Sequence, residues 1–163
     1  MKDVAANSRS VGIQDGPDTR MKEAGTLRIV DTHAHMVDSV FDVDRAEVLE
    51  RARKSGVIAV VAVGETLDDA GRNLRLGEER PSLKPAAGLY PTHLDTAEAE
   101  RLADWVRRHR DRLVAIGEVG LDRWAVKEEK ERQIQVDIFR AFIRLAGELR
   151  LPLNVHSRSP GRE

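Results

Sequence analysis

The stretch Arg28-Ile29-Val30-Asp31-Thr32-His33-Ala34-His35 decides between the two architectures that this 163-residue sequence allows. It is a short apolar run that ends in polar residues, which predicts a β-strand followed by a loop. An open, doubly wound sheet would be favoured by a glycine-rich phosphate loop after its first strand. Thr32 to His35 stands in that place instead, and this favours strands arranged as a barrel.

The rest of the chain alternates short apolar runs with longer amphipathic stretches, the pattern of strand–helix units in a parallel sheet. Helices are expected from Asp44, Thr66 and Asp95, and over about 128–149. Further strands are expected at 57–63, 83–88, 113–117 and 153–156. A barrel of eight such units needs roughly 250 residues. The predicted fold is therefore α/β, an incomplete TIM-like (β/α) barrel of about five parallel strands with flanking helices.

The chain has two parts that differ in composition and in hydrophobic periodicity. Residues 1–26 mix Asn, Ser, Gly, Asp and Pro without hydrophobic periodicity, which predicts a disordered polar leader. Residues 27–163 are interpreted as the N-terminal portion of the barrel domain, a truncated unit that stops before the barrel closes. The open edge of such a sheet is expected to allow self-association.

Composition narrows the function further. Lys and Arg total 27 and Asp and Glu total 28, so no excess of basic charge attracts nucleic acid in general. The continuous run Val57 to Val63 predicts a strand buried on both faces, and it is far shorter than the roughly 20 residues that cross a bilayer. No apolar signal core follows the N-terminus. We therefore expect a cytoplasmic protein without a membrane segment.

The candidate metal ligands all fall near the expected carboxyl ends of strands. Residues i and i+2 of a strand point to the same side, so His33 and His35 would form a two-point clamp. Glu118 is expected to follow the strand at 113–117, and His156 to end the strand at 153–156. Barrel enzymes place their active sites at that end of the strands. The agreement of the four positions predicts one metal site, with Glu118 as its catalytic carboxylate.

The donor types restrict the metal. Because the sequence has no cysteine, a transition metal must be held by His, Asp or Glu. Imidazole with carboxylate suits zinc, manganese or iron, and magnesium is possible where water completes the shell. A bridging acid permits two divalent ions. Such a centre lowers the pKa of bound water and polarises a phosphoryl or acyl oxygen, which predicts hydrolysis without a protein nucleophile.

Other polar and aromatic residues are assigned smaller roles. Arg158 could hold a substrate phosphate, although a rim salt bridge is the commoner use of such a residue. Tyr90 is expected to line the substrate pocket, and His93 to contact a loop. His109 is expected to face solvent. Trp105 and Trp124 are expected to be packing residues, with Trp124 the likelier of the two to reach the pocket because it lies in the loop after Glu118.

Five motifs in order resemble the signatures of the TatD-type metal-dependent hydrolases of the amidohydrolase superfamily. They are Val30-Asp31-Thr32-His33-Ala34-His35, Gly88-Leu89-Tyr90-Pro91, Ile116-Gly117-Glu118-Val119-Gly120-Leu121-Asp122, Gln133 with Phe139, and Leu151-Pro152-Leu153-Asn154-Val155-His156-Ser157-Arg158. The resemblance extends from Leu27 to Gly161. Tyr90 stands where many members of the family have histidine.

This resemblance implies a TIM-like barrel with two divalent metals and a 3′–5′ deoxyribonuclease or related phosphodiesterase activity on nucleic acid. By motif position, His33 and His35 would ligate one metal, Glu118 would bridge both, and His156 would ligate the other. The family pattern continues with a histidine after strand six and an aspartate after strand eight, both beyond the matching residues of this sequence.

Two other functions remain open at this stage. One is a non-catalytic metal-binding or assembly fragment, which fits an incomplete ligand set and an open sheet edge. The other is an amide or ester hydrolase of the same superfamily, because one metal centre can serve several electrophiles and the fold does not choose among them.

Overall fold

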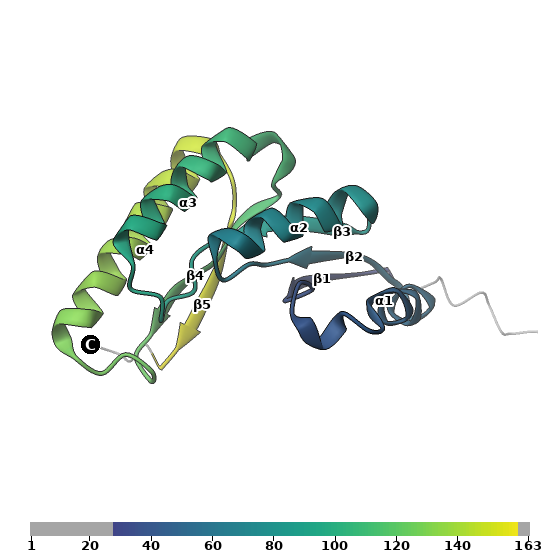
Figure 1. The fold of residues 1–163 in the computed structure, drawn as a ribbon, viewed down its shortest axis with the longest axis horizontal. Helices are drawn as coiled ribbons and strands as arrows, with labels where there is room; N and C mark the ends of the chain where they lie inside the picture. The colour runs from purple at the N-terminus through teal and green to yellow at the C-terminus, as the bar shows by residue number, and fades with distance from the viewer. Residues whose placement is uncertain (1–27, 160–163) are drawn as a thin grey trace, which may run out of the picture.

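The computed structural model describes residues 28–159, which form a curved parallel sheet with helices packed against it. The polar leader predicted at 1–26 lies outside the described residues. The sheet has five parallel strands in the order β1-β2-β3-β4-β5, so each strand pairs with the next along the chain. The predicted incomplete TIM-like barrel is confirmed in this arrangement (Figure 1).

The elements alternate as the sequence predicts. The strands are β1 (Ile29–Ala34), β2 (Val57–Ala62), β3 (Leu83–Ala87), β4 (Ala115–Asp122) and β5 (Leu153–Arg158). The α-helices are α1 (Arg45–Lys54), α2 (Leu67–Glu79), α3 (Thr96–His109) and α4 (Glu129–Leu149), and the short 3-10 helices are η1 (Ser39–Phe41) and η2 (Arg110–Arg112).

The predicted helix starts are correct, although their chemistry differs. Thr66 caps α2 by accepting a hydrogen bond from the backbone N–H of Asp69, and Asp95 caps α3 in the same way. Asp44 precedes α1, but its side chain makes no capping hydrogen bond. Sequence patterns therefore located all three helices.

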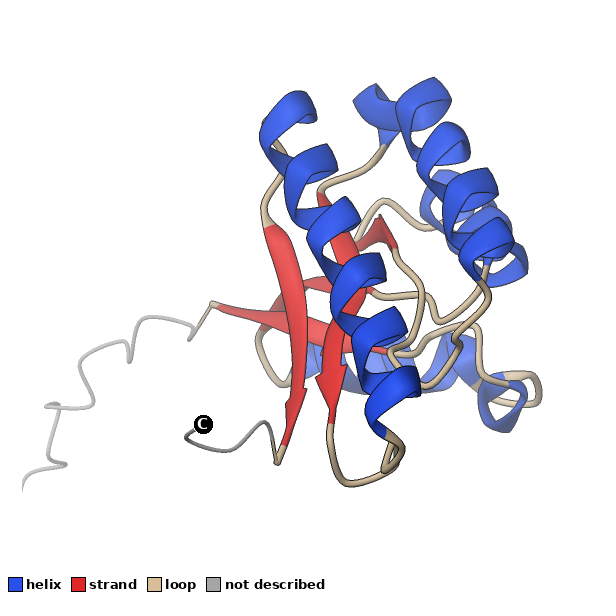
Figure 2. Ribbon diagram, turned by 90° about the vertical axis from the view of Figure 1, so that its left-hand side faces the viewer, coloured by secondary structure: helices blue, strands red, loops and turns tan. Residues whose placement is uncertain are grey.

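Two of the helices cover the C-terminal half of the sheet. Helices α3 and α4 lie side by side, and α4 packs on β4 (Figures 1 and 2). The largest core cluster fills the space between them and the sheet, and it includes Leu102, Val106, Ile116, Phe142 and Leu145. This packing anchors β4, and β5 is held beside it by parallel pairing from Ile116 and Leu153 onward.

The strand at 57–63 differs from the expectation that it would be buried on both faces. Val60 and Ala62 are buried, but Ile58 is 43% exposed and the residues that alternate with them are only half-buried. Ile58 lines an open groove with Leu49 and Arg80 at the amino end of the sheet. The apolar run therefore predicted the strand correctly and its burial incorrectly.

The main correction concerns where β4 and β5 end. The expected strands stopped at Gly117 and His156, whereas the observed ones continue to Asp122 and Arg158. Glu118 and His156 are therefore inside strands and not at their ends. Glycines at 117 and 120 are typical of a turn, but here they allow the backbone of β4 to lie very close to that of β5. A Cβ at Gly120 would lie 2.0 Å from the carbonyl oxygen of His156.

Within residues 28–159, no helix combines the length and apolar character needed to cross a membrane.

We predict that Gly120→Ala destabilises the protein by about 2–3 kcal/mol, because the added methyl group forces β4 away from β5. Gly147→Ala is the matched control. Gly147 lies inside α4 with open space around it, so alanine should stabilise the helix by about 0.5–1 kcal/mol. Urea unfolding followed by circular dichroism measures both values, and equal stability of the two variants would contradict the close-contact explanation.

Candidate metal centre

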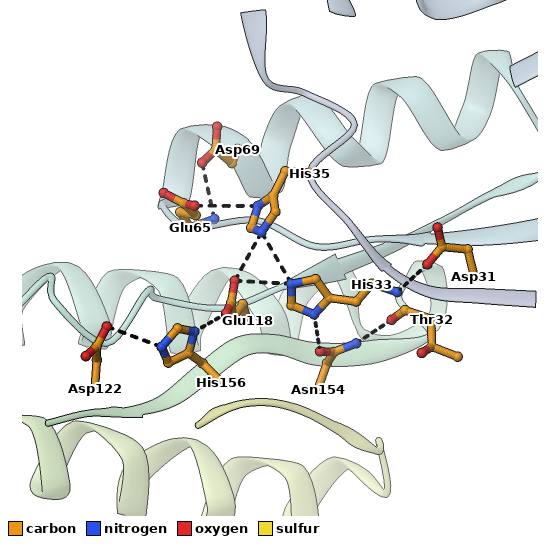
Figure 3. A network of polar contacts seen from close by, with 10 residues as sticks. All are labelled: Asp31, Thr32, His33, His35, Glu65, Asp69, Glu118, Asp122, Asn154 and His156. Carbon is orange, nitrogen blue, oxygen red and sulfur yellow. Dashed lines mark hydrogen bonds and ion pairs between the residues drawn. The ribbon is translucent and has the colours of Figure 1, made fainter. Parts of the chain in front are cut away.

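Three of the predicted ligands meet at one point of the sheet. His33 in β1 and His35 just after it direct their Nε2 atoms toward Oε2 of Glu118 in β4 (Figure 3). The two Nε2 atoms are 3.3 Å apart, and they lie 3.4 Å and 3.2 Å from that oxygen. Strands β1 and β4 do not pair with each other, so the curvature of the sheet brings these groups together.

The spacing of the three atoms fits a metal ion. Tetrahedral zinc at its usual ligand distances of about 2.0–2.2 Å holds neighbouring donor atoms about 3.3–3.6 Å apart. Glu118 is only 3% exposed, and its buried Oε2 has no partner with hydrogen-bonding geometry among the described residues. A buried carboxylate oxygen without such a partner is costly, and a cation would compensate for that cost.

His156 joins the site through the other oxygen of the same carboxylate. Its Nδ1 donates to Oε1 of Glu118 at 2.5 Å, while its Nε2 lies 3.4 Å from Oδ2 of Asp122 (Figure 3). This Nε2 is also buried without a hydrogen-bond partner. The structure therefore brings all four predicted ligands together, but it places His156 beside the three-atom cluster and not within it.

The charges of the site are coupled. The carboxylate of Glu118 raises the pKa of His35 above its ordinary value, burial opposes this, and Glu65 and Asp69 add to it. Burial raises the pKa of Glu118, but its interactions with His35 and His156 outweigh burial and lower the pKa overall. Glu118 is thus held ionised, the form that binds a cation.

Three polar residues at the site were missed by the sequence analysis. Glu65 Oε1 lies 3.5 Å from Nδ1 of His35, and Asn154 Oδ1 lies 2.8 Å from Nδ1 of His33. Asp122, which faces His156, is buried and accepts hydrogen bonds from the backbone N–H groups of Trp124 and Ala125. Two available signals were an acid three residues after the end of β2, Glu65, and an amide two residues before His156, Asn154.

The residues with smaller predicted roles are placed as follows. Tyr90 packs edge-on against His156, with ring centroids 5.0 Å apart, and also contacts His93. The guanidinium of Arg158 lies 3.8 Å from the ring centroid of Trp124 and makes no rim salt bridge among the pairs that the structure gives. His109 does not simply face solvent, because it stacks on Trp105 and is half-buried.

Comparison with known proteins agrees with the presence of a candidate metal site. The sequence model of the family described as TatD related DNase matches residues 30–163. The chain belongs to the TatD-related DNase family. The resemblance inferred from the five motifs is thereby confirmed.

Individual relatives agree with this family. Deoxyribonuclease TATDN3 of Homo sapiens is 41% identical over 156 residues, which cover 87% of this chain and 56% of the relative. A metal-dependent hydrolase of Bacillus subtilis, YabD, is 35% identical over 133 residues, covering 80% of this chain and 51% of the relative.

A solved structure from the TatD-related family matches the fold. The crystal structure of the TatD homologue YjjV of Escherichia coli superposes with a TM-score of 0.73 at 29% identity, over 82% of this chain and 52% of that one. The chain therefore spans about half the length of the relatives it matches.

We predict that a divalent metal binds more weakly as the pH falls through the raised pKa of His35, because the metal must displace a proton from this ring. Glu65→Gln should move this loss of affinity to lower pH, since Glu65 helps to raise that pKa. Titration calorimetry with zinc in buffers of different ionisation enthalpy measures affinity and proton release together. His109→Gln, far from the site in α3, should behave as the unaltered chain. A metal affinity that does not change with pH would contradict the competition between the proton and the metal for His35.

Proposed function

We propose that this chain forms the metal-binding part of a hydrolase that cleaves phosphodiester bonds of DNA. The observation that carries the proposal is the group of three donor atoms, Nε2 of His33, Nε2 of His35 and the buried Oε2 of Glu118, which lie 3.2–3.4 Å from one another. The family supports the reaction class, because its matched members are named deoxyribonucleases or metal-dependent hydrolases.

The residues have distinct parts in this proposal. His33, His35 and Glu118 hold a divalent ion, which supplies an activated water and polarises a phosphoryl oxygen when bound. His156 donates to Glu118 and keeps that carboxylate in place. We propose two ions for the whole enzyme, zinc, manganese or magnesium, with Glu118 and His156 contributing to the second. The 3′–5′ direction of cleavage is part of the same proposal.

The rim beside the site suits a nucleic-acid strand. Trp124 is 56% exposed, the Arg158 guanidinium stacks on it, and the Lys127 ammonium lies 5.9 Å from its ring centroid. An exposed aromatic ring with cations nearby is the usual means of binding single strands, because every base can stack and every phosphate is negative. We propose Arg158 and Tyr90 as substrate-binding residues, with Trp124 as the stacking surface.

We predict that Glu118→Gln abolishes hydrolysis and lowers metal affinity at least tenfold, because the neutral amide attracts a cation far less than the carboxylate does. The assay uses this chain and a fusion of it to the C-terminal half of human TATDN3, each with manganese or zinc. Substrates are 3′-labelled single-stranded DNA, a bis-aryl phosphodiester and an aryl ester. Asp111→Asn, an exposed acid of η2, is the control.

The same samples separate the competing functions. Cleavage of the ester without cleavage of either phosphodiester would favour the amide or ester hydrolase. Metal binding with oligomer formation and no turnover by the fusion would favour the assembly module. The observation behind this alternative is that Val30 in β1 and Val155 in β5, the two outer strands of the sheet, are each about half exposed. Light scattering measures the oligomer.

We predict that Trp124→Ala or Arg158→Ala in the fusion raises KM for single-stranded DNA by about 5–150-fold, the loss expected for one stacked base. The KM for the small bis-aryl phosphodiester should change much less, because that substrate has no neighbouring bases. Lys130→Ala removes an exposed cation of α4 and serves as the control. An equal rise in KM for both substrates would show that Trp124 and Arg158 do not bind the DNA strand.

A further inference from the structure

We propose that Asn154 is a positioning residue that presents the Nε2 lone pair of His33 to the metal before the metal arrives. The inference deepens the proposed function, on which it rests for the identity of the ligand. Asn154 lies in β5 two residues before His156, so both side chains are on the same side of that strand.

The orientation of the Asn154 amide is determined by its neighbours. Its Nδ2 is 2.6 Å from the backbone carbonyl oxygen of Thr32. A carbonyl oxygen only accepts hydrogen bonds, so the amide nitrogen must be the group that faces it. The amide oxygen Oδ1 is consequently directed at Nδ1 of His33, 2.8 Å away (Figure 3).

This orientation selects one form of the His33 ring. Because Oδ1 of Asn154 only accepts, Nδ1 of His33 must carry the hydrogen that it donates. In the neutral ring, Nε2 then has the free lone pair, and Nε2 is the atom that faces His35 and Glu118. A polar partner on the second nitrogen of a metal-binding histidine fixes both its tautomer and its ring orientation.

The contact also joins two strands that are not neighbours in the sheet. Asn154 belongs to β5 and its two partners to β1, at opposite ends of the strand order. Gly117 makes room for it, because a Cβ at that position would lie 2.5 Å from Cβ of Asn154. The side chain that positions His33 is therefore accommodated by the residue directly before Glu118.

The experiment compares Asn154→Leu, Asn154→Asp and the control Val155→Ala in the 163-residue chain. Leucine has the same branched shape and the same number of side-chain heavy atoms as asparagine but cannot hydrogen-bond, whereas aspartate keeps an acceptor for Nδ1. Val155 follows on the other side of the strand and is 48% exposed. Two readouts are needed: the tautomer of His33 in metal-free protein at alkaline pH, from long-range ¹⁵N–¹H NMR spectra of ¹⁵N-histidine-labelled chain, and the affinity for zinc from calorimetry.

We expect the unaltered chain, Val155→Ala and Asn154→Asp to hold His33 in the Nδ1–H form, and Asn154→Leu to lose it. Zinc affinity should fall about 10–100-fold in Asn154→Leu and recover at least partly in Asn154→Asp. An unchanged tautomer in Asn154→Leu would overturn the inference, and so would an unchanged affinity. If Asn154→Leu does not fold, an Nε2–H form of His33 in Asn154→Asp would overturn it.

The two proposals fail in different ways. If the unaltered chain binds no zinc or manganese, the proposed function fails, and the tautomer spectra still decide whether Asn154 controls His33. If the unaltered chain binds metal but Asn154→Leu binds it equally well, only the role of Asn154 fails.

Discussion

The burial of one carboxylate is the constraint on which the rest of the site depends. Glu118 points from the middle of β4 into the concave side of the sheet and is 3% exposed. An ionised carboxylate removed from water needs positive or hydrogen-bonding partners. Three imidazoles, from β1, from the residue just after it and from β5, surround the carboxylate, and they come from positions up to 123 residues apart, 33 to 156. The curvature of the sheet is thus a condition for this acid to be tolerated there.

The fold was largely predictable because its signals are local. The capping residues Thr66 and Asp95 located two helices, and the absence of a glycine-rich loop after β1 favoured the barrel. Strand ends were less predictable, because glycine marks turns and close strand contacts equally well in a sequence. Gly117 and Gly120 belong to the second class, and only the neighbouring backbone of β5 distinguishes the two.

The site was predictable in its residue types and less so in its contacts. His33, His35, Glu118 and His156 were identified by strand position and by resemblance, and the structure brings them together. Asn154 and Glu65 act on the far nitrogens of two of these rings, and no spacing rule connects them, since each contact joins different strands or loops. Such pairings depend on sheet curvature, which a linear pattern does not encode.

The glycines near Glu118 and the polar side chains of the site depend on each other for their positions. A Cβ at Gly88 would lie 2.5 Å from the carbonyl oxygen of Glu118, and one at Gly117 would meet Asn154. The backbone that carries Glu118 is therefore in close contact with the segments on both sides, leaving it little freedom to shift. Because a metal site tolerates misplacement of its ligands poorly, rigid backbone around the shared carboxylate is as necessary as the ligands themselves. The small residues around Glu118 are consequently part of the candidate metal centre, because they fix the backbone that carries its shared carboxylate.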